Sequence, residues 1–319
     1  MDPEQRARLL AAKLQALVTS TAGPRDRRSL AFPGGAALTG ADGTWVLADA
    51  APARSLGPAL AVAAKGGSID RVNVFAEHDT GLLARRAAQF ASPPAIWRVD
   101  GADVQRAEPA PLPAVAPLPA VAAPFADVIA AAGADPVVEH GRLIGEVEGL
   151  EVCRVEIGEN GEARLAIGVG RFDREAHDLL RGQDLAEVVA LVRRHRVDSD
   201  EPHPLRRWAA DRALRSRLVR DPALVGADHL APMAPVVEAP DLRTPWPAPA
   251  TGVDDRGEPL VVVCSVGVDL DLVPAAADAR LQDGRDARLV LAVAARDAHA
   301  ITVALAAALE RPADVVAVA

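Results

Sequence analysis

The chain has 319 residues and a formal net charge of −9, and half of its residues are hydrophobic. This length accommodates two or three domains, and the apolar content supplies a sizeable core, which excludes a chain that is disordered throughout. The negative charge argues against broad electrostatic attraction to nucleic acid or anionic lipid, so nucleic acid is not a favoured partner.

Arginine supplies nearly all of the positive charge, because Lys13 and Lys65 are the only lysines. The chain after Lys65 therefore lacks the lysine that a Schiff base, a Walker A loop or an ExK nuclease motif requires. Cys153 and Cys264 stand singly in apolar segments, which is not the spacing of a disulfide framework or a zinc site. The N-terminal sequence has no apolar signal region, and we expect a soluble cytoplasmic protein with no membrane partner.

Residues 1–108 are predicted to form an N-terminal α/β domain. Hydrophobic residues at helical spacing predict a helix over 4–18, and a loop rich in Gly and Pro follows. Apolar segments at 44–49, 72–77 and 95–99 are expected to be strands with helices between them. This alternation indicates a parallel sheet, but the GxGxxG fingerprint of a dinucleotide site is absent.

Residues 109–124 are rich in Pro and Ala, and the hexapeptide APLPAV occurs twice, at 110–115 and 116–121. Such a composition predicts a polyproline-II linker between domains. Docking of a proline-binding partner is the alternative.

Residues 125–225 are predicted to form an α+β middle segment around a β-hairpin. Asp184 and Glu187 form a capping box for one helix, and Pro204 starts a second helix that ends at Asp221.

The hairpin is predicted from Asn160-Gly161, the strongest two-residue turn signal in the chain. A type I′ turn there sets Glu151 over a floor that includes Gly168 and Gly170, and turns Arg154 to the opposite face. Small residues on a sheet allow close approach of a helix or of a ligand.

Carboxylates surround this hairpin. The candidate metal ligands are Glu146, Glu148, Glu151 and Asp173, and the last three are also the candidate catalytic residues. Carboxylates that converge at a strand end suit Mg²⁺, and no other cofactor is assignable. The alternatives are a solvated acidic rim and, for Asp173, a helix N-cap.

The order helix, three strands, helix, with acidic residues on the middle strands, resembles the restriction-endonuclease-like PD-(D/E)xK core. Two features depart from that pattern. The order Asp135-Pro136 is reversed, and Arg154 stands one place later than the family's lysine and on the other face from Glu151. The resemblance implies a degenerate divalent-metal-dependent nuclease or phosphodiesterase.

Residues 226–258 are predicted to be a Pro-rich connector, and 259–319 a C-terminal α/β segment with three strands. Three strands are few for a separate sheet, so we expect them to join the sheet of the middle or N-terminal segment. Asp269 and Asp271 follow the first of these strands and are candidate ligand-binding residues, with helix capping as the alternative.

Arg206 and Arg207 are the other ligand-binding candidates. They lie in an arginine-rich helix that is able to hold phosphates, and ion pairs within this acidic protein are the alternative.

Four strings, GEVEGLEVCRV, GVGRFDREAHDLL, HPLRRWAADRALR and SVGVDLDLVPAAADARL, resemble a family of uncharacterised conserved proteins from high-GC Gram-positive bacteria. This resemblance implies no activity.

The predicted fold class is α/β, with two βαβαβ-like segments that flank the α+β middle segment. Three functions stay open. The first is non-catalytic binding of a small anionic ligand or a protein partner. The second is a metal-dependent nuclease or phosphodiesterase, and the third is a structural or scaffold protein.

Overall fold

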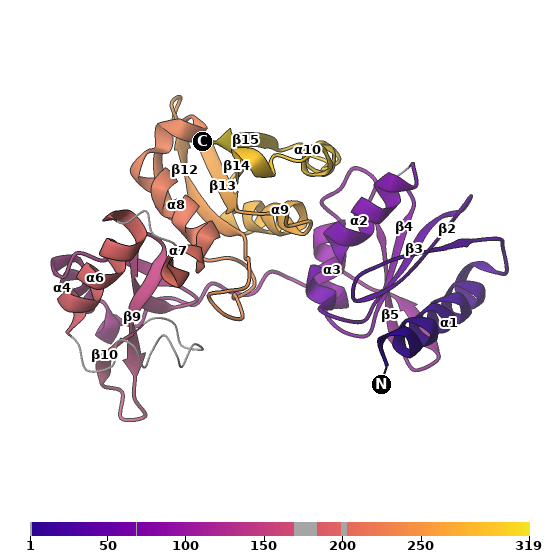
Figure 1. The fold of residues 1–319 in the computed structure, drawn as a ribbon, viewed down its shortest axis with the longest axis horizontal. Coiled ribbons are helices and arrows are strands. Elements are labelled where there is room, and N and C mark those ends of the chain that lie inside the picture. Colours follow the sequence, from indigo (N-terminus) through magenta and orange to yellow (C-terminus); the bar gives the residue numbers. More distant parts are fainter. Residues whose placement is uncertain (1, 68, 169–183, 199–202) are drawn as a thin grey trace. The chain divides into compact units, whose positions relative to one another are not determined.

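A computed structural model describes residues 2–67, 69–168, 184–198 and 203–319 (Figure 1). The predicted α/β class is confirmed, since helices and mixed sheets make up the fold. The chain forms two compact units, and the C-terminal segment contributes to both. The first unit comprises Met1–Leu112, Leu270–Asp278 and Ala298–Val315, and the second comprises Pro113–Asp269, Ala279–Asp297 and Val316–Ala319.

The first unit contains a six-stranded sheet whose strands lie in sequence order. The strands are β1 (Arg28–Leu30), β2 (Gly35–Gly40), β3 (Gly43–Ala48), β4 (Val72–Ala76), β5 (Ala95–Asp100) and β6 (Asp103–Arg106). The three predicted strands, β3 to β5, run parallel as expected. The antiparallel strands β1, β2 and β6 were not predicted, because they are short or contain Gly and lack a strong apolar pattern.

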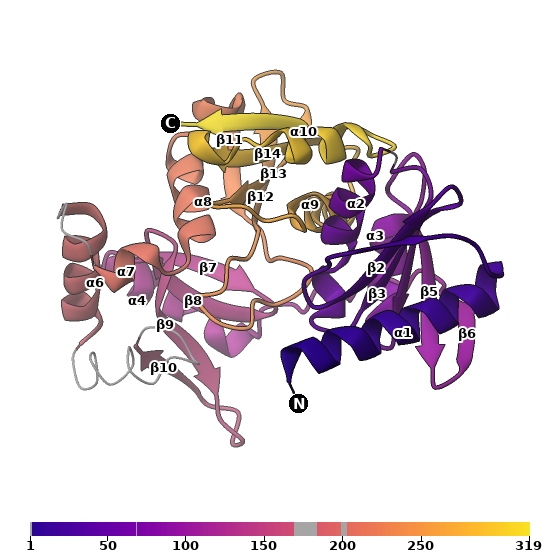
Figure 2. The same cartoon turned by 45° about the vertical axis from the view of Figure 1, so that its right-hand side comes forward.

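Helices cover both faces of this sheet. Figures 1 and 2 show α1 (Pro3–Ala22) on one side, and α2 (Leu56–Lys65) and α3 (Thr80–Ala87) on the other. The apolar stripe of α1, formed by Leu14, Leu17 and Val18, packs against strand side chains such as Trp45 and Phe75. The helical spacing that predicted α1 is therefore the spacing of its buried face.

The second unit contains a four-stranded antiparallel sheet in the order β10-β9-β8-β7. Its strands are β7 (Asp135–Glu139), β8 (Arg142–Val147), β9 (Leu150–Ile157) and β10 (Ala163–Ile167). Helices α4 (Phe125–Ala131) and α6 (Leu185–Arg193) share a hydrophobic core with the sheet. The predicted capping box is present, because the Asp184 side chain accepts from the Glu187 N–H and Glu187 reaches back to the Asp184 N–H.

The pairing of β9 with β10 differs from the predicted register by one residue. A two-residue turn at Asn160-Gly161 would set Cys153 opposite Gly168, whereas Cys153 lies opposite Ile167. Gly161 is left-handed, with φ 79°, and its N–H donates to the Gly158 carbonyl, which makes the loop one residue longer. Hairpin loops of three residues commonly combine a turn with such a left-handed residue.

The two-residue turns of this sheet lie elsewhere. His140 and Gly141 connect β7 to β8 with φ values of 49° and 72°. Glu148 and Gly149 connect β8 to β9 with φ values of 51° and 75°. Positive φ at both central residues is the type I′ signature, which fits the natural twist of paired strands. The sequence signal was weaker here because His and Glu stand where Asn or Asp is usual.

A β-bulge interrupts the pairing of β8 with β9. Gly145 lies opposite Cys153, but the next residue, Glu146, lies opposite Glu151. Val152 is therefore an extra residue on β9. An extra residue reverses the alternation of side chains beyond it, so positions that regular strand geometry puts on opposite faces come to the same face.

The third sheet of the described residues has five strands in the order β11-β12-β13-β14-β15. Its strands are β11 (Ala227–Pro232), β12 (Ala248–Asp254), β13 (Pro259–Ser265), β14 (Arg288–Ala294) and β15 (Asp314–Val318). The three predicted C-terminal strands do not join another segment's sheet. Their partners β11 and β12 come from residues 226–258, where Pro and Gly within the strands concealed them.

The predicted second helix of the middle segment is two helices, α7 (Pro204–Arg207) and α8 (Ala210–Arg220). Ala209 interrupts it with a left-handed conformation, φ 48°. Helix α8 lies against the five-stranded sheet (Figure 1), and its Leu214 and Leu218 belong to the hydrophobic core of that sheet. The remaining elements are α9 (Leu272–Asp283), α10 (Ala300–Ala307), the π-helical turn Arg194–Asp198 and the 3-10 turns Pro52–Arg54, Ala120–Ala122, Pro222–Val225 and Ala295–Asp297.

The Pro-rich segment is attached to the fold along part of its length. Leu118 and Ala122 pack against the core of the four-stranded sheet, and Ala120–Ala122 is a 3-10 turn. None of the helices in the described ranges has the length and apolar character needed to cross a membrane.

The close approach of the β8–β9 turn to α8 makes a testable prediction. A Cβ at Gly149 would lie 2.3 Å from the carbonyl carbon of Arg212, and φ is 75°. We expect Gly149→Ala to destabilise the protein by about 2–5 kcal/mol, the sum of left-handed strain and overpacking. Gly161→Ala is the matched control, because φ is 79° and nothing lies within 4 Å, so only the strain remains. Equal losses in chemical denaturation would contradict the close packing.

Candidate functional site

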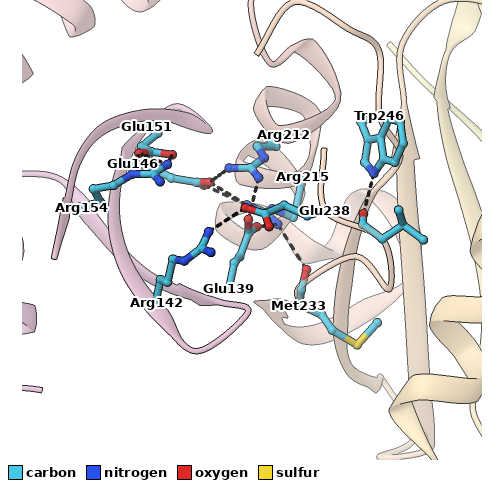
Figure 3. A network of polar contacts seen from close by, with 11 residues as sticks. Glu139, Arg142, Glu146, Glu151, Arg154, Arg212, Arg215, Met233, Glu238 and Trp246 are labelled. Carbon is cyan, nitrogen blue, oxygen red and sulfur yellow. Dashed lines mark hydrogen bonds and ion pairs between the residues drawn. The ribbon is translucent and has the colours of Figure 1, made fainter. Parts of the chain in front are cut away.

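Four charged side chains form a buried ion-pair cluster on one face of the four-stranded sheet (Figure 3). Arg212 donates to Glu139 at 2.6 Å and to Glu146 at 3.0 Å. Arg215 donates to the same two carboxylates, at 2.9 Å each, and its side chain is only 1% exposed. The cluster is neutral, and each carboxylate contacts both guanidinium groups.

Local geometry explains why these residues meet. Asp135 pairs with Glu146 across β7 and β8, and Glu139 is four residues after Asp135, so strand alternation sets both glutamates on one face. Arg212 and Arg215 are three residues apart on α8, which is the spacing of neighbours on a helix surface. Burial raises the pKa of Glu139, but Arg212 and Arg215 outweigh it and hold that pKa below its ordinary value.

The β-bulge brings a second pair together. Arg154 donates to both carboxylate oxygens of Glu151, at 2.5 and 2.7 Å, although we predicted that the two residues lie on opposite faces. That prediction was wrong because the extra residue Val152 lies between them. Burial lowers the pKa of the Arg154 guanidinium, but the Glu151 carboxylate more than compensates and the pKa is raised overall.

A small cavity of about 60 Å³ lies beside these pairs. Its wall includes the Arg142, Arg154 and Arg212 side chains and residues of the segment Glu238–Trp246. Arg142 donates to Glu238 at 2.7 Å, and this pair is half-exposed, at 41% and 49%. Figure 3 shows Arg142 and Arg154 projecting from the strands.

The segment that closes the cavity is held by hydrogen bonds. The Trp246 indole donates to the Val237 carbonyl at 2.8 Å, and the Trp246 N–H donates to the Asp211 carboxylate at 3.0 Å. Asp241 accepts from the N–H groups of Arg243 and Thr244. Burial raises the pKa of Asp211, against the effect of the N–H groups bound to it.

A larger hollow of about 400 Å³ lies next to the cavity and shares two of its residues, Arg142 and Arg154. The rest of its lining comes from the starts and ends of neighbouring strands and from the Pro-rich segment: Pro119, Ala122, Gly141, Leu143, Val155, Glu156 and Ile157.

The predicted metal ligands are bound by different arginines, although Glu146 and Glu151 lie opposite each other on β8 and β9. Glu146 belongs to the buried cluster and Glu151 is bound to Arg154. Glu148 lies in the β8–β9 turn and pairs with Arg220. Asp173 and the predicted glycine partner of Glu151, Gly170, lie outside the described residues. Among the residues that the structure describes, no three His, Cys, Asp or Glu side chains are grouped to hold a metal ion.

None of the other predicted ligand residues lines the cavity. Asp271 is buried in the first unit, where it accepts from Arg86 at 2.7 Å and from the Gly57 N–H. Asp269 is partly buried and raises the pKa of Asp211 as a like charge. Arg206 and Arg207 lie on α7, and neither lines the cavity.

The pairing of Arg142 with Glu238 was not predicted. They are 96 positions apart and belong to the first position of β8 and to a loop segment, so no periodicity relates them. The arginines of α8 carried a weak signal, since Arg215 is three residues before Leu218 and four after Asp211, the spacing of one helix face, and a buried arginine needs a buried partner.

Comparison of the chain with protein-family models, with curated proteins and with solved structures finds no match.

Because the cluster is buried, we expect the loss of Arg215 to lower the free energy of unfolding strongly. Arg215→Met should destabilise the second unit by about 3–5 kcal/mol, because two buried carboxylates lose a partner. Arg207→Met is the control, since Arg207 is exposed and should change the free energy of unfolding little. Both are measured by denaturant unfolding. A loss below about 1 kcal/mol for Arg215→Met would show that the cluster is dispensable.

The two thiols are expected to be unreactive in the folded protein. Burial raises the pKa of Cys153 to about 11 and that of Cys264 to about 12. The thiolate, which is the reactive form, is then scarce at pH 8. Titration with a thiol reagent should label neither cysteine until denaturant is added. Rapid labelling of the native protein would contradict this burial.

Proposed function

We propose that this is a non-catalytic binding protein whose cavity in the second unit takes a small anionic group. One observation carries the proposal. The Glu238 carboxylate, which comes from a separate segment of the chain, forms an ion pair with the Arg142 guanidinium at the cavity wall. The same carboxylate also raises the pKa of Arg154, which lines the cavity as well.

The exposure of the three arginines distinguishes their roles. Arg212 and Arg154 are each 15% exposed and are bound to largely buried glutamates. Arg142 is 41% exposed and its partner Glu238 is 49% exposed. Exposed ion pairs contribute only about 0–1 kcal/mol, so an external anion competes readily with Glu238 for Arg142.

The surrounding carboxylates support binding more than chemistry. Glu139, Glu146 and Glu151 each accept from a guanidinium group, so their carboxylates are already occupied and are not available as metal ligands or as acid–base groups. The buried thiols of Cys153 and Cys264 have raised pKa values. In the described part of the chain, the cavity wall carries three guanidinium groups, each paired with a carboxylate, and no activated nucleophile beside them.

The size of the cavity limits the anionic group. A water molecule needs roughly 10–15 Å³ of such space, so about 60 Å³ admits a group of a few heavy atoms. A carboxylate or a phosphate fits this limit, and both match the planar donor fork of arginine.

Calorimetric titration with inorganic phosphate tests the proposal. Glu238→Gln should tighten binding about two- to fivefold, because it removes the internal competitor. Arg142→Gln should weaken binding at least about tenfold, because it removes a charged donor. Arg164→Gln is the control. Arg164 also pairs with an exposed glutamate, Glu156, at 2.7 Å, but does not line the cavity.

Three outcomes oppose the proposal. The proposal would be contradicted if the folded protein bound neither phosphate nor carboxylates. It would also be contradicted if Arg142→Gln and the wild type bound phosphate with equal affinity. Cleavage of DNA or RNA in the presence of Mg²⁺ or Mn²⁺, lost in Glu151→Gln, would favour the nuclease instead.

A further inference from the structure

The wall of the small cavity carries more negative than positive side chains. Besides its three arginines it includes five carboxylates, those of Glu139, Glu151, Asp211, Glu238 and Asp241. Three of these carboxylates form ion pairs with the three arginines. The other two are left without an arginine of the wall as partner.

The two remaining carboxylates are stabilised by backbone N–H groups. Asp211 accepts from two of them, and Asp241 accepts from two others. An N–H group carries no net charge, so these hydrogen bonds stabilise a carboxylate without neutralising it. Burial raises the pKa of Asp241, but hydrogen bonds led by that of the Thr244 N–H outweigh it and hold that pKa below its ordinary value. The wall therefore keeps an excess of negative charge.

This excess limits the kind of ligand that suits the cavity. A ligand with negative charge alone would displace Glu238 from Arg142 and leave the Glu238 carboxylate without a cation, beside other carboxylates. Like charges brought together at a binding site are unfavourable. A ligand that also carries an ammonium group gives Glu238 a new partner, so that both members of the original ion pair stay compensated.

The pair of Arg142 with Glu238 is placed to admit such a ligand. Arg142 is the first residue of β8, whereas Glu238 belongs to the loop between β11 and β12. Figure 3 shows the two side chains directed toward each other, and they are 41% and 49% exposed. Because the two side chains come from separate segments and are about half-exposed, they are able to move apart around a small molecule.

One polar atom beside the cavity has no hydrogen-bond partner. The His140 side chain lines the cavity, and within the described ranges its buried Nε2 atom makes no hydrogen bond. An imidazole nitrogen is able to donate or to accept, depending on its protonation. A polar ligand that reaches His140 would supply the missing hydrogen bond, which adds to its affinity.

We propose that the ligand is a small zwitterion: its carboxylate pairs with Arg142 and its ammonium group pairs with Glu238, the charge pattern of an α-amino acid. This inference rests on the proposed function and adds the chemical class of the ligand. The volume of about 60 Å³ favours the smallest members of this class.

Glycine and glycolate test the class. They have the same number of heavy atoms and both carry a carboxylate, but only glycine carries an ammonium group. In calorimetric titrations of the full-length protein, glycine should bind about three- to tenfold more tightly than glycolate, because it compensates Glu238. Equal affinities, or tighter binding of glycolate, would overturn the inference.

The substitution Glu238→Gln should act on the two ligands in opposite directions. It should weaken glycine binding, because the ammonium group loses its partner, and tighten glycolate binding about two- to fivefold, because the internal competitor is gone. The glycine-to-glycolate affinity ratio should therefore fall close to one.

Glu156→Gln is the matched control. Glu156 is also about half-exposed, at 41%, and pairs with an arginine, Arg164, at 2.7 Å, but it does not line the cavity. This variant should keep the wild-type affinity ratio. A ratio that survives Glu238→Gln, or that falls equally in Glu156→Gln, would show that Glu238 does not bind the ammonium group and would overturn the inference.

The results separate this inference from the proposed function. If glycolate and phosphate bind and glycine binds no more tightly than glycolate, only the zwitterionic class fails. If none of the three binds to protein that is folded by circular dichroism, the proposed function fails and the inference with it.

Discussion

The second unit depends on the buried cluster of Arg212 and Arg215 with Glu139 and Glu146. Helix α8 packs its leucines on the five-stranded sheet and directs these arginines to the four-stranded sheet. A buried charge is tolerated only with a partner, so the cluster permits one alignment of helix and strands and makes others costly. The alignment also sets the first turn of α8 at the cavity wall, which makes the candidate site a consequence of the cluster.

Two irregularities of the strands then shape the site. The bulge at Val152 turns Arg154 to the side of Glu151, and the pairing of β8 with β9 ends at Ile144 and Arg154, beside the larger hollow. Bulges and open strand ends leave backbone and side chains accessible where a regular ladder would close them. The site is thus built on the least regular part of an otherwise ordinary antiparallel sheet.

The ion pairs around the cavity support the proposal of binding rather than chemistry. Buried ion pairs occupy the Glu146 and Glu151 carboxylates, whereas the pair of Arg142 with Glu238 is about half-exposed, and exposed ion pairs contribute little stability. The same residue types that suggested Mg²⁺ ligands in the sequence have arginine partners in the fold. The chemistry of a carboxylate depends on what it faces, and composition alone does not report that.

The sequence by itself determined the α/β class, the parallel strands β3 to β5, the helix α1 and the capping box of Asp184 and Glu187, because these follow from local periodicity and local hydrogen bonds. Only the tertiary structure decided the strand register, the bulge, the partners of the C-terminal strands and the pairing of Arg142 with Glu238. One extra residue in a loop or strand reverses which side chains meet, and pairs far apart in the chain leave no periodic trace.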